Sequence, residues 1–384
     1  MSRKRLQRPK DSAPTVKTVA DLAGVSIASA SRVLNGLGAS VETTRRVREA
    51  ADQVGYVPNA LGRSLQSQRT GLLALAVADI GNPVYVEMMR AIEDVAKAGG
   101  YQLLVHATGA DPDAEVALIQ GLARRYVDGL ILSPLRLTER HLVAMRTSPV
   151  PVIVVGKLPD DAPHDNVRAD SHAGVALAIR HLAAIGRRRI AFVNGAPDTS
   201  PAIARLAAYQ HALADNGLAY DEILVEFGDF QYAQGRDATA RLLDRCGDPA
   251  PDAIFCANDL IAAGALHELL TRGMAVPDDV ALVGMDDTAL ATMTFPQLTS
   301  VSLGAAERGR HAAELMLTRL VDPDLEPRRI SVDPVLAVRQ SCGALAATTA
   351  SAATTASAAT TAGAATANAA ATAPTPATGS RATA

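Results

Sequence analysis

The residues best suited to recognition chemistry lie in the stretch TVADLAGVSIASASRVLNG, residues 18–36. Helical periodicity places Ile27, Ala28, Ser31 and Arg32 on one face of a short helix, opposite an apolar face. An arginine can donate two hydrogen bonds to the O6 and N7 atoms of guanine, and small apolar side chains can contact a thymine methyl group. This face therefore suggests that the helix reads base edges in the major groove of DNA.

The elements that would hold this face follow a helix-turn-helix pattern. An apolar stripe with i, i+3, i+4, i+7 spacing ends at Gly24, where the chain must turn sharply. Ser26 and Ser40 are placed to cap the second and third helices, and Asn35-Gly36 ends the second. A small helical bundle without a nucleic-acid role would show the same pattern, so periodicity alone leaves that alternative open.

Charge is distributed unevenly along the chain. Residues 1–68 carry eleven Lys and Arg against five Asp and Glu, a net charge of +6, so the rest carries −9 of the overall −3. A basic N-terminal segment on an acidic body indicates a polyanionic partner for that segment. This observation favours the DNA-binding interpretation over a plain bundle.

Motifs for catalysis, cofactors and metals are missing from the sequence. It shows no phosphate-binding glycine loop, G-x-S-x-G or H-E-x-x-H motif, and its eight histidines and three cysteines have no metal-ligand spacing. There is no uninterrupted apolar run of 18 residues and no secretory h-region. We therefore expect a soluble cytoplasmic protein that is not an enzyme, uses no cofactor or metal and does not bind membranes.

Residues 70–343 alternate between short apolar runs, such as GLLALAV and AIFC, and longer helical patterns. This alternation predicts parallel sheets with helices on both faces, and the segment is long enough for two lobes. Residues 1–14 are polar and basic and are interpreted as a disordered arm. Residues 344–384 are an Ala/Thr-rich segment that we expect to be disordered and to which we assign no function.

The segments TVADLAGVSIASASRVLNG and GYVPNALGRSL resemble the LacI/GalR family of bacterial transcription regulators, and the resemblance continues in ADIGNPVY, ANDLIAAGAL and GMDDTALA. It implies a helix-turn-helix head at 15–57, a hinge helix and linker at 58–69, and a periplasmic-binding-protein-like body at 70–343. The body would bind an effector and dimerise. Its lobes are predicted at about 70–160 plus 298–328 and about 161–297 plus 329–343.

The resemblance also assigns DNA contacts. Ile27, Ala28 and Arg32 match base-contacting positions, and Leu65 matches a hinge residue that enters the minor groove as an apolar wedge. The positions that match phosphate contacts are Thr15, Ser26, Ser31, Ser40, Tyr56 and Asn59. The loop LNGLGAS is one residue shorter than in the lactose repressor, a difference that we expect to alter affinity more than specificity.

In the body, the resemblance implies an effector site in the cleft between the lobes. Its expected residues are Tyr85, Arg205, Phe230, Asn258 and Asp286. An arginine, a carboxylate and an aromatic platform suit a sugar, although purines and other small metabolites remain alternatives. Arg205 could instead be a surface charge, and Asn258 with Asp259 could equally cap a helix. We expect Asp287 and Thr288 to start a helix rather than to bind the ligand.

The function expected from these observations is a repressor whose operator affinity is controlled by a small effector, with a sugar as the leading candidate. One such head buries too little surface for high specificity, so a homodimer on a pseudopalindromic double-stranded operator is expected. The sequence shows no leucine-heptad segment at its C-terminus, where the lactose repressor has its tetramer helix, so we expect a dimer rather than a tetramer. The rivals are a transport-type solute-binding protein and a metabolite-converting enzyme. The effector, the operator and the sign of the effector's action stay open at this point.

Overall fold

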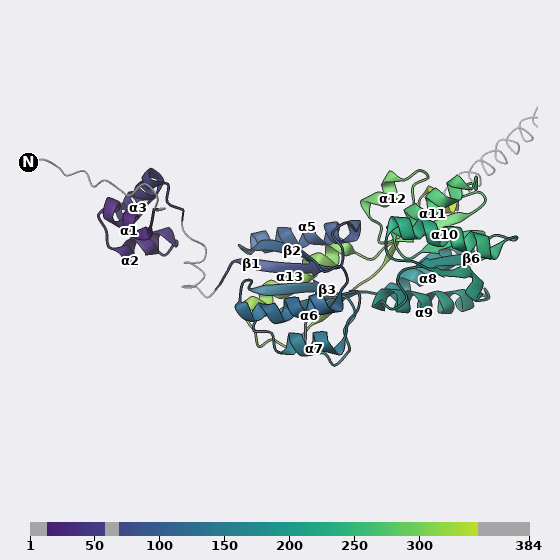
Figure 1. Ribbon diagram of the computed structural model, residues 1–384, viewed down its shortest axis with the longest axis horizontal. Helices are drawn as coiled ribbons and strands as arrows, with labels where there is room; N and C mark the ends of the chain where they lie inside the picture. The colour runs from purple at the N-terminus through teal and green to yellow at the C-terminus, as the bar shows by residue number, and fades with distance from the viewer. Residues whose placement is uncertain (1–13, 58–68, 345–384) are drawn as a thin grey trace, which may run out of the picture.

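The computed structural model describes residues 14–57 and 69–344, which form a three-helix head and a two-lobed α/β body (Figure 1). The predicted hinge helix with Asn59 and Leu65 lies outside the described residues, as do residues 1–13 of the arm and the tail from residue 345. Among the described residues, no helix combines the length and apolar character that a membrane span requires.

The head consists of α1 (Val16–Ala23), α2 (Ile27–Leu34) and α3 (Val41–Val54), which enclose a small core of valine and alanine side chains. The predicted caps are present. Ser26 accepts a hydrogen bond from the Ser29 amide at 3.0 Å, and Ser40 accepts one from the Thr43 amide at 3.2 Å. Gly24 has a φ of 62°, so the turn between α1 and α2 uses the left-handed conformation that glycine tolerates best.

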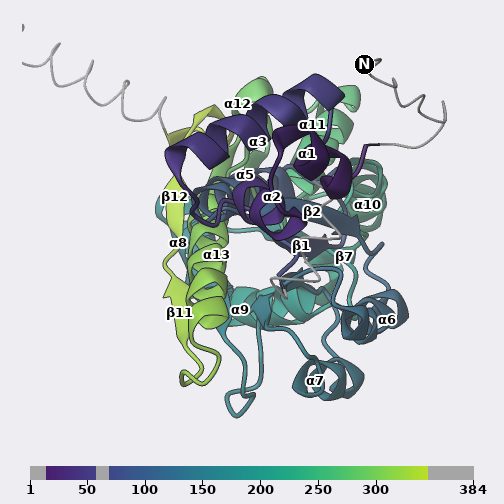
Figure 2. The same ribbon diagram turned by 90° about the vertical axis from the view of Figure 1, so that its left-hand side faces the viewer.

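The first lobe is built on a six-stranded parallel sheet with the order β11-β5-β4-β3-β1-β2. Its strands are β1 (Leu72–Val77), β2 (Gln102–Ala107), β3 (Gly129–Ser133), β4 (Val152–Val155), β5 (Asn166–Ala169) and β11 (Arg329–Val332). Two pairs of helices cover opposite faces, α5 (Pro83–Ala98) with α13 (Ala305–Val321), and α6 (Pro112–Gly121) with α7 (Glu139–Arg146) (Figure 2).

The second lobe has the order β12-β10-β9-β8-β6-β7, with β12 as an antiparallel edge strand. Its strands are β6 (Ile190–Asn194), β7 (Val225–Phe227), β8 (Ala253–Cys256), β9 (Ala281–Met285), β10 (Thr299–Ser302) and β12 (Val335–Ala337). The covering helices are α8 (Ser171–Ala184), α9 (Ser200–Asp215), α10 (Tyr232–Cys246) and α11 (Asp259–Thr271), and the short α12 (Ala289–Met293) follows β9. The predicted helix-covered sheets are confirmed, apart from the direction of β12.

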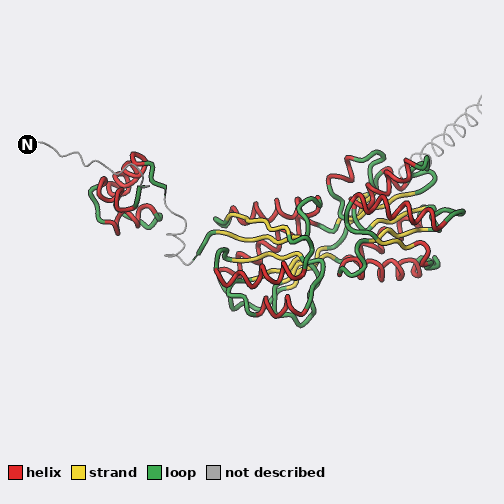
Figure 3. Tube along the Cα trace, viewed as in Figure 1, coloured by secondary structure: helices red, strands yellow, loops and turns green. Residues whose placement is uncertain are grey.

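The predicted lobe boundaries were wrong at all three crossovers. Strand β5 pairs with β4 and β11, so residues 166–169 and 329–332 belong to the first lobe. Strand β10 pairs with β9, so residues 299–302 belong to the second lobe. Short apolar strands beside a crossover have the same pattern whichever sheet they join, and only their hydrogen-bond partners decide. Loops from both lobes meet where the chain crosses between them (Figure 3).

Candidate functional site

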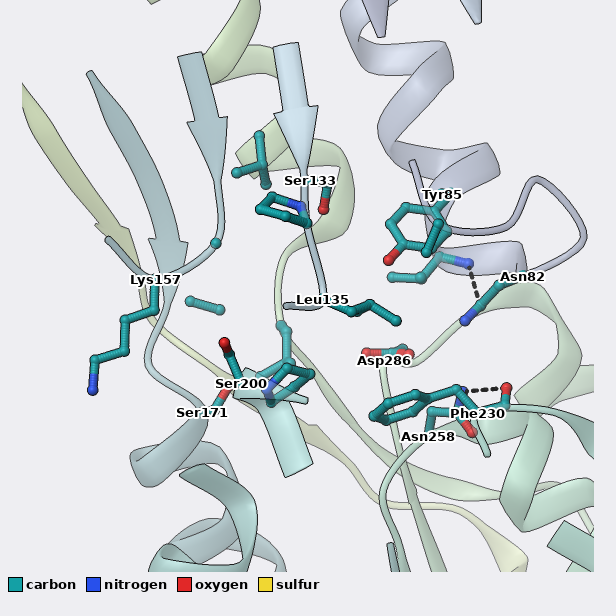
Figure 4. A pocket seen from close by; sticks show the side chains of 18 of the residues that line it. Asn82, Tyr85, Ser133, Leu135, Lys157, Ser171, Ser200, Phe230, Asn258 and Asp286 are labelled. Atoms are coloured by element: carbon teal, nitrogen blue, oxygen red, sulfur yellow. Dashed lines mark hydrogen bonds between the residues drawn. The ribbon is translucent and has the colours of Figure 1, made fainter. Parts of the chain in front are cut away.

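A cavity of about 840 Å³ lies between the two lobes, beyond the carboxyl ends of several parallel strands. This is where open α/β sheets bind ligands, and the volume is within the usual range for small-molecule sites. All five residues predicted to bind an effector line it: Tyr85, Arg205, Phe230, Asn258 and Asp286. Figure 4 shows Tyr85, Phe230, Asn258 and Asp286 on one side of the cavity and Lys157, Ser171 and Ser200 on the other.

Arg205 lies in the second turn of α9 and is buried, so the surface-charge alternative is wrong. Its Nη1 donates a hydrogen bond to the Ala257 carbonyl at 2.6 Å. The guanidinium carbon is 5.9 Å from the ring centroid of Phe230, within the range of a cation–π contact. Its Nε is shut off from solvent and has no hydrogen-bond partner among the described residues.

Asp286 follows β9 in a strained backbone conformation with a φ of 100°, and its side chain is buried in the cavity wall. Burial raises the pKa of this carboxyl, and the guanidinium groups of Arg205 and Arg308 oppose the shift. Behind it, Asp259 accepts hydrogen bonds from the Thr288 amide at 2.7 Å and the Ser300 hydroxyl at 2.6 Å. These bonds hold the loop that presents Asp286.

Tyr85 and Asn258 have different roles in the cavity wall. Burial raises the pKa of Tyr85 to about 12, with the negative charge of Asp286 adding to the effect, so its hydroxyl stays a neutral donor at ordinary pH. Asn258 caps α11 by accepting a hydrogen bond from the Ile261 amide at 2.8 Å, and its Nδ2 donates to the Phe230 carbonyl at 3.1 Å. Its helix-cap role is therefore confirmed, and it also positions Phe230.

Arg308, in the first turn of α13, also lines the cavity and was not among the predicted site residues. Two polar contacts between the lobes were not predicted either. Gln231 Nε2 donates to Asp79 Oδ2 at 2.8 Å, and Arg136 donates to both carboxylate oxygens of Asp198 at 2.7 and 2.8 Å. The spacing of these residues gives no sign of a site, because each lies in a helix or loop where a polar residue is expected to face solvent.

In the head, the predicted base-reading residues share one outward surface of α2. Ile27 is 52% exposed, and Ala28 and Arg32 are also exposed. The Nη2 of Arg32 donates only a long hydrogen bond, 3.3 Å, to the Gly38 carbonyl. An exposed isoleucine, beside an arginine that makes one weak hydrogen bond, can contact base edges without first breaking strong internal contacts.

Three of the predicted phosphate-contacting residues are helix caps. Thr15, Ser26 and Ser40 precede α1, α2 and α3, and each hydroxyl accepts a hydrogen bond from its own helix. Helix N-termini attract phosphate groups, so capping and phosphate contact are compatible. Ser31 accepts a hydrogen bond from Asn35, and Tyr56 packs half-buried against the head core.

The folded head carries little of the basic surplus. Residues 14–57 contain five Lys and Arg against four Asp and Glu, whereas residues 1–13 contain five against one. Within the head, Arg45 is paired with Glu42 at 2.7 Å and with Glu49 at 2.9 Å. The electrostatic attraction to a polyanion therefore depends mainly on the arm. The described residues contain no group of three or more His, Cys, Asp or Glu that could hold a metal ion.

Comparison with known families gives two matches, one in the head and one that covers most of the second lobe with α13 and β11 of the first. Residues 15–59 match the family described as bacterial regulatory proteins, lacI family, and residues 179–342 match a periplasmic binding protein-like domain. The regulator CelR of Thermobifida fusca is 35% identical over 337 residues, which cover 85% of this chain and 98% of CelR. The ribose operon repressor of Escherichia coli is 32% identical over 332 residues, which cover 85% and 99%.

Solved structures of similar proteins have the same arrangement of a head and a two-lobed body. A complex of CelR with cellobiose superposes with a TM-score of 0.65 at 35% identity, covering 85% of this chain and 99% of that one. A lac repressor dimer bound to operator and the anti-inducer ONPF reaches a TM-score of 0.77 at 24% identity, covering 86% and 99%. At that identity, the second comparison shows the shared fold alone.

Proposed function

The chain belongs to the LacI family of DNA-binding transcriptional regulators, and on that premise we propose that it is a repressor whose affinity for operator DNA is set by a small polyhydroxylated effector. The observation that carries the proposal is the grouping of buried Arg205 and Asp286 with Phe230 in one cavity. The arginine donates and the carboxylate accepts hydrogen bonds, while the ring offers an apolar face, a combination suited to a sugar. The similarity to a regulator solved with cellobiose supports this class.

Polar contacts between the lobes supply a means of control. The Gln231–Asp79 hydrogen bond, the Arg136–Asp198 ion pair and a hydrogen bond of 2.8 Å from the Ser200 amide to the Leu135 carbonyl join lobe to lobe. A ligand that prefers one spacing of the lobes would shift the population toward it. If the two heads can bind the operator at only one spacing of the lobes, ligand binding in the cavity is then coupled to DNA binding by the head.

Exposed apolar residues support a homodimer. The edge strand β2 exposes Leu104 and Val105, and Ile80 is exposed nearby in the same lobe. In the second lobe Phe295, just after α12, is 84% exposed. Strand β2 and α12 both lie toward the upper side of the body in Figure 1. An uncovered edge strand and exposed aromatic group favour association, and a two-fold dimer would present two heads to a pseudopalindrome.

In the head, we assign base reading to Ile27, Ala28 and Arg32, with phosphate contacts from the capping hydroxyls. The minor-groove role of Leu65 and the phosphate contact of Asn59 remain predictions, because these residues lie outside the described part of the chain. Replacing Leu65 with Ala should weaken operator binding and reduce DNA bending.

The test begins with selection of an operator from a random DNA library by the full-length protein. A thermal-shift screen of neutral sugars and nucleobases follows, without and with the selected operator. We expect a sugar to raise the melting temperature, and the change in its affinity when operator is added gives the sign of the coupling. If no DNA sequence is enriched, the repressor proposal fails, and if only nucleobases bind, the sugar class fails.

A further inference from the structure

One of the charged residues that line the cavity, Arg308, has a poorly satisfied side chain. It comes from α13 of the first lobe, and its Nε is shut off from solvent without a hydrogen-bond partner. Burial lowers the pKa of this guanidinium, and the nearby carboxyl of Asp286 opposes that shift. No side-chain hydrogen bond or ion pair of Arg308 is found within the described residues. The residue as a whole is half-buried, and a guanidinium that has lost part of its hydration without gaining a hydrogen bond is costly unless a ligand binds it.

The inner part of the cavity has more positive than negative charge. Arg205 and Arg308 both face Asp286, which is the buried carboxylate they share. Both guanidinium Nε atoms lack partners. One carboxylate therefore stands against two cations, and one further negative charge would balance the group.

The two walls of the cavity also differ in sign. Among the lining residues, the first lobe contributes the cations Lys157, Arg168 and Arg308 against the carboxylate of Asp79. Asp79 is already bonded to Gln231, and Arg168 lies 3.9 Å from the carboxylate of Asp160. The second lobe contributes three carboxylates, Asp170, Asp229 and Asp286, against the cation of Arg205. A ligand with its negative group toward the first lobe and its hydroxyls toward the second would match both walls.

From this arrangement we infer that the effector carries an anionic group, a phosphate or a carboxylate, and that Arg308 binds it from the first lobe. The effector is then a sugar phosphate or a sugar acid, with its hydroxyls directed to Asp286 and its apolar face to Phe230. This inference rests on the proposed effector function of the cavity. A guanidinium fork can donate two parallel hydrogen bonds to either anion, whereas a neutral sugar leaves the charge of Arg308 unbalanced.

The experiment uses the full-length protein and matched probes. Each set compares a neutral sugar with its anionic derivatives. One set is D-glucose with D-glucose 6-phosphate and D-gluconate, and the other is D-ribose with D-ribose 5-phosphate. Inorganic phosphate, compared with chloride at equal ionic strength, tests the anion alone. Thermal shift ranks the probes and calorimetry gives Kd. We expect an anionic member of a set to bind at least tenfold more tightly than its neutral parent. A phosphate preference over a carboxylate, or the reverse, identifies the group.

Three variants place the effect at Arg308. Arg308→Met should remove the preference for the anion and raise the melting temperature of the ligand-free protein, because a partly desolvated charge without a protein partner is lost. Arg308→Lys should keep part of the preference, since the charge remains without the fork. Arg310→Met is the matched control, because Arg310 lies on the same helix at an exposed position that does not line the cavity, so it should leave the preference unchanged.

The outcomes separate this inference from the proposed function. If neutral sugars bind as well as or better than their anionic partners, the inference is overturned while the effector proposal stands. If Arg308→Met keeps the full preference, the assignment to Arg308 is wrong. If no sugar of either kind binds, both the inference and the sugar-sensor proposal fail, and operator selection then tests the DNA-binding function separately.

Discussion

In the head, Ile27 and Arg32 stand on the outside of α2, whereas in the body Arg205 and Asp286 lie inside a cavity. The described head satisfies its polar groups through its own caps and surface ion pairs, as Ser26 and Arg45 show. The cavity instead leaves buried guanidinium nitrogens without partners. Before a partner binds, the polar groups of the head surface are thus already satisfied, whereas some of those in the cavity are not.

This difference has an energetic consequence. An exposed face can be changed in sequence with little cost in stability, so the head can alter its DNA preference while its fold stays the same. A buried charged cluster ties ligand binding to folding, because each side chain there changes both. The following predictions test that separation, beginning with the largest effect.

The largest effect is expected from placing a charge in the head core. Val47 is fully buried at the centre of the three helices, so Val47→Asp should destabilise the head by about 3 kcal/mol or more and unfold it. Operator binding should be lost while sugar binding by the body is kept. Circular dichroism and NMR of the head, together with ligand thermal shifts, would check this.

The matched control is Val41→Asp, since Val41 is 88% exposed at the first position of α3, where a negative charge is favourable. This variant should retain a folded head. A folded head in the Val47→Asp variant would contradict the assignment of the core.

The next largest effect concerns the cavity. Arg205→Met should weaken effector binding by about 100-fold, because it removes a buried charged donor, while operator affinity at fixed salt changes by less than about twofold. Calorimetry and DNA-binding titrations measure the two quantities. Arg180→Met, an equal change at an exposed position on α8, should alter neither. An unchanged response to effector would show that Arg205 does not contact the ligand.

A smaller effect is expected from pH. Burial raises the pKa of Asp259 to about 7, outweighing the hydrogen bonds from Ser300 and Thr288 that lower it. The folded body then holds a proton that the unfolded chain releases near pH 4. The stabilisation from this group is complete below about pH 4 and is lost progressively as pH rises to about 7.

Asp259→Asn should flatten that part of the curve of melting temperature against pH. Asp244→Asn is the control, because the hydrogen bond from Arg272 lowers the pKa of its exposed carboxyl below its ordinary value, so this variant should leave the curve between pH 4 and 7 unchanged. If the wild-type curve and the Asp259→Asn curve run parallel between pH 4 and 7, Asp259 does not titrate in this range.

The smallest effect on stability is expected on the outer face of α2. Exchanging the pair, as Ile27→Ala with Ala28→Ile, should change the preferred operator by about 1–3 kcal/mol per affected base pair. The melting temperature of the head should change little, since both positions are exposed. Selection from a randomised library measures the preference. An unaltered preferred site would remove this pair from base recognition.

Much of the molecule was predictable from short-range signals. Helical periodicity and the capping serines at 26 and 40 located the head helices, and the apolar runs located most strands of the body. The residues expected around the effector came from the family resemblance, and the structure places them in one cavity. Their DNA and effector contacts remain predictions.

The sequence by itself determined the helix-turn-helix, the alternation of strands and helices, and the identity of the outward face of α2. The physical reason is that periodicity, caps and turns act over a few neighbouring residues. Only the tertiary structure decided which sheet β5, β10 and β11 join, and that Arg308 meets Arg205 and Asp286 without a partner for its Nε. These features arise from contacts between segments far apart in the chain, on which local pattern carries no information.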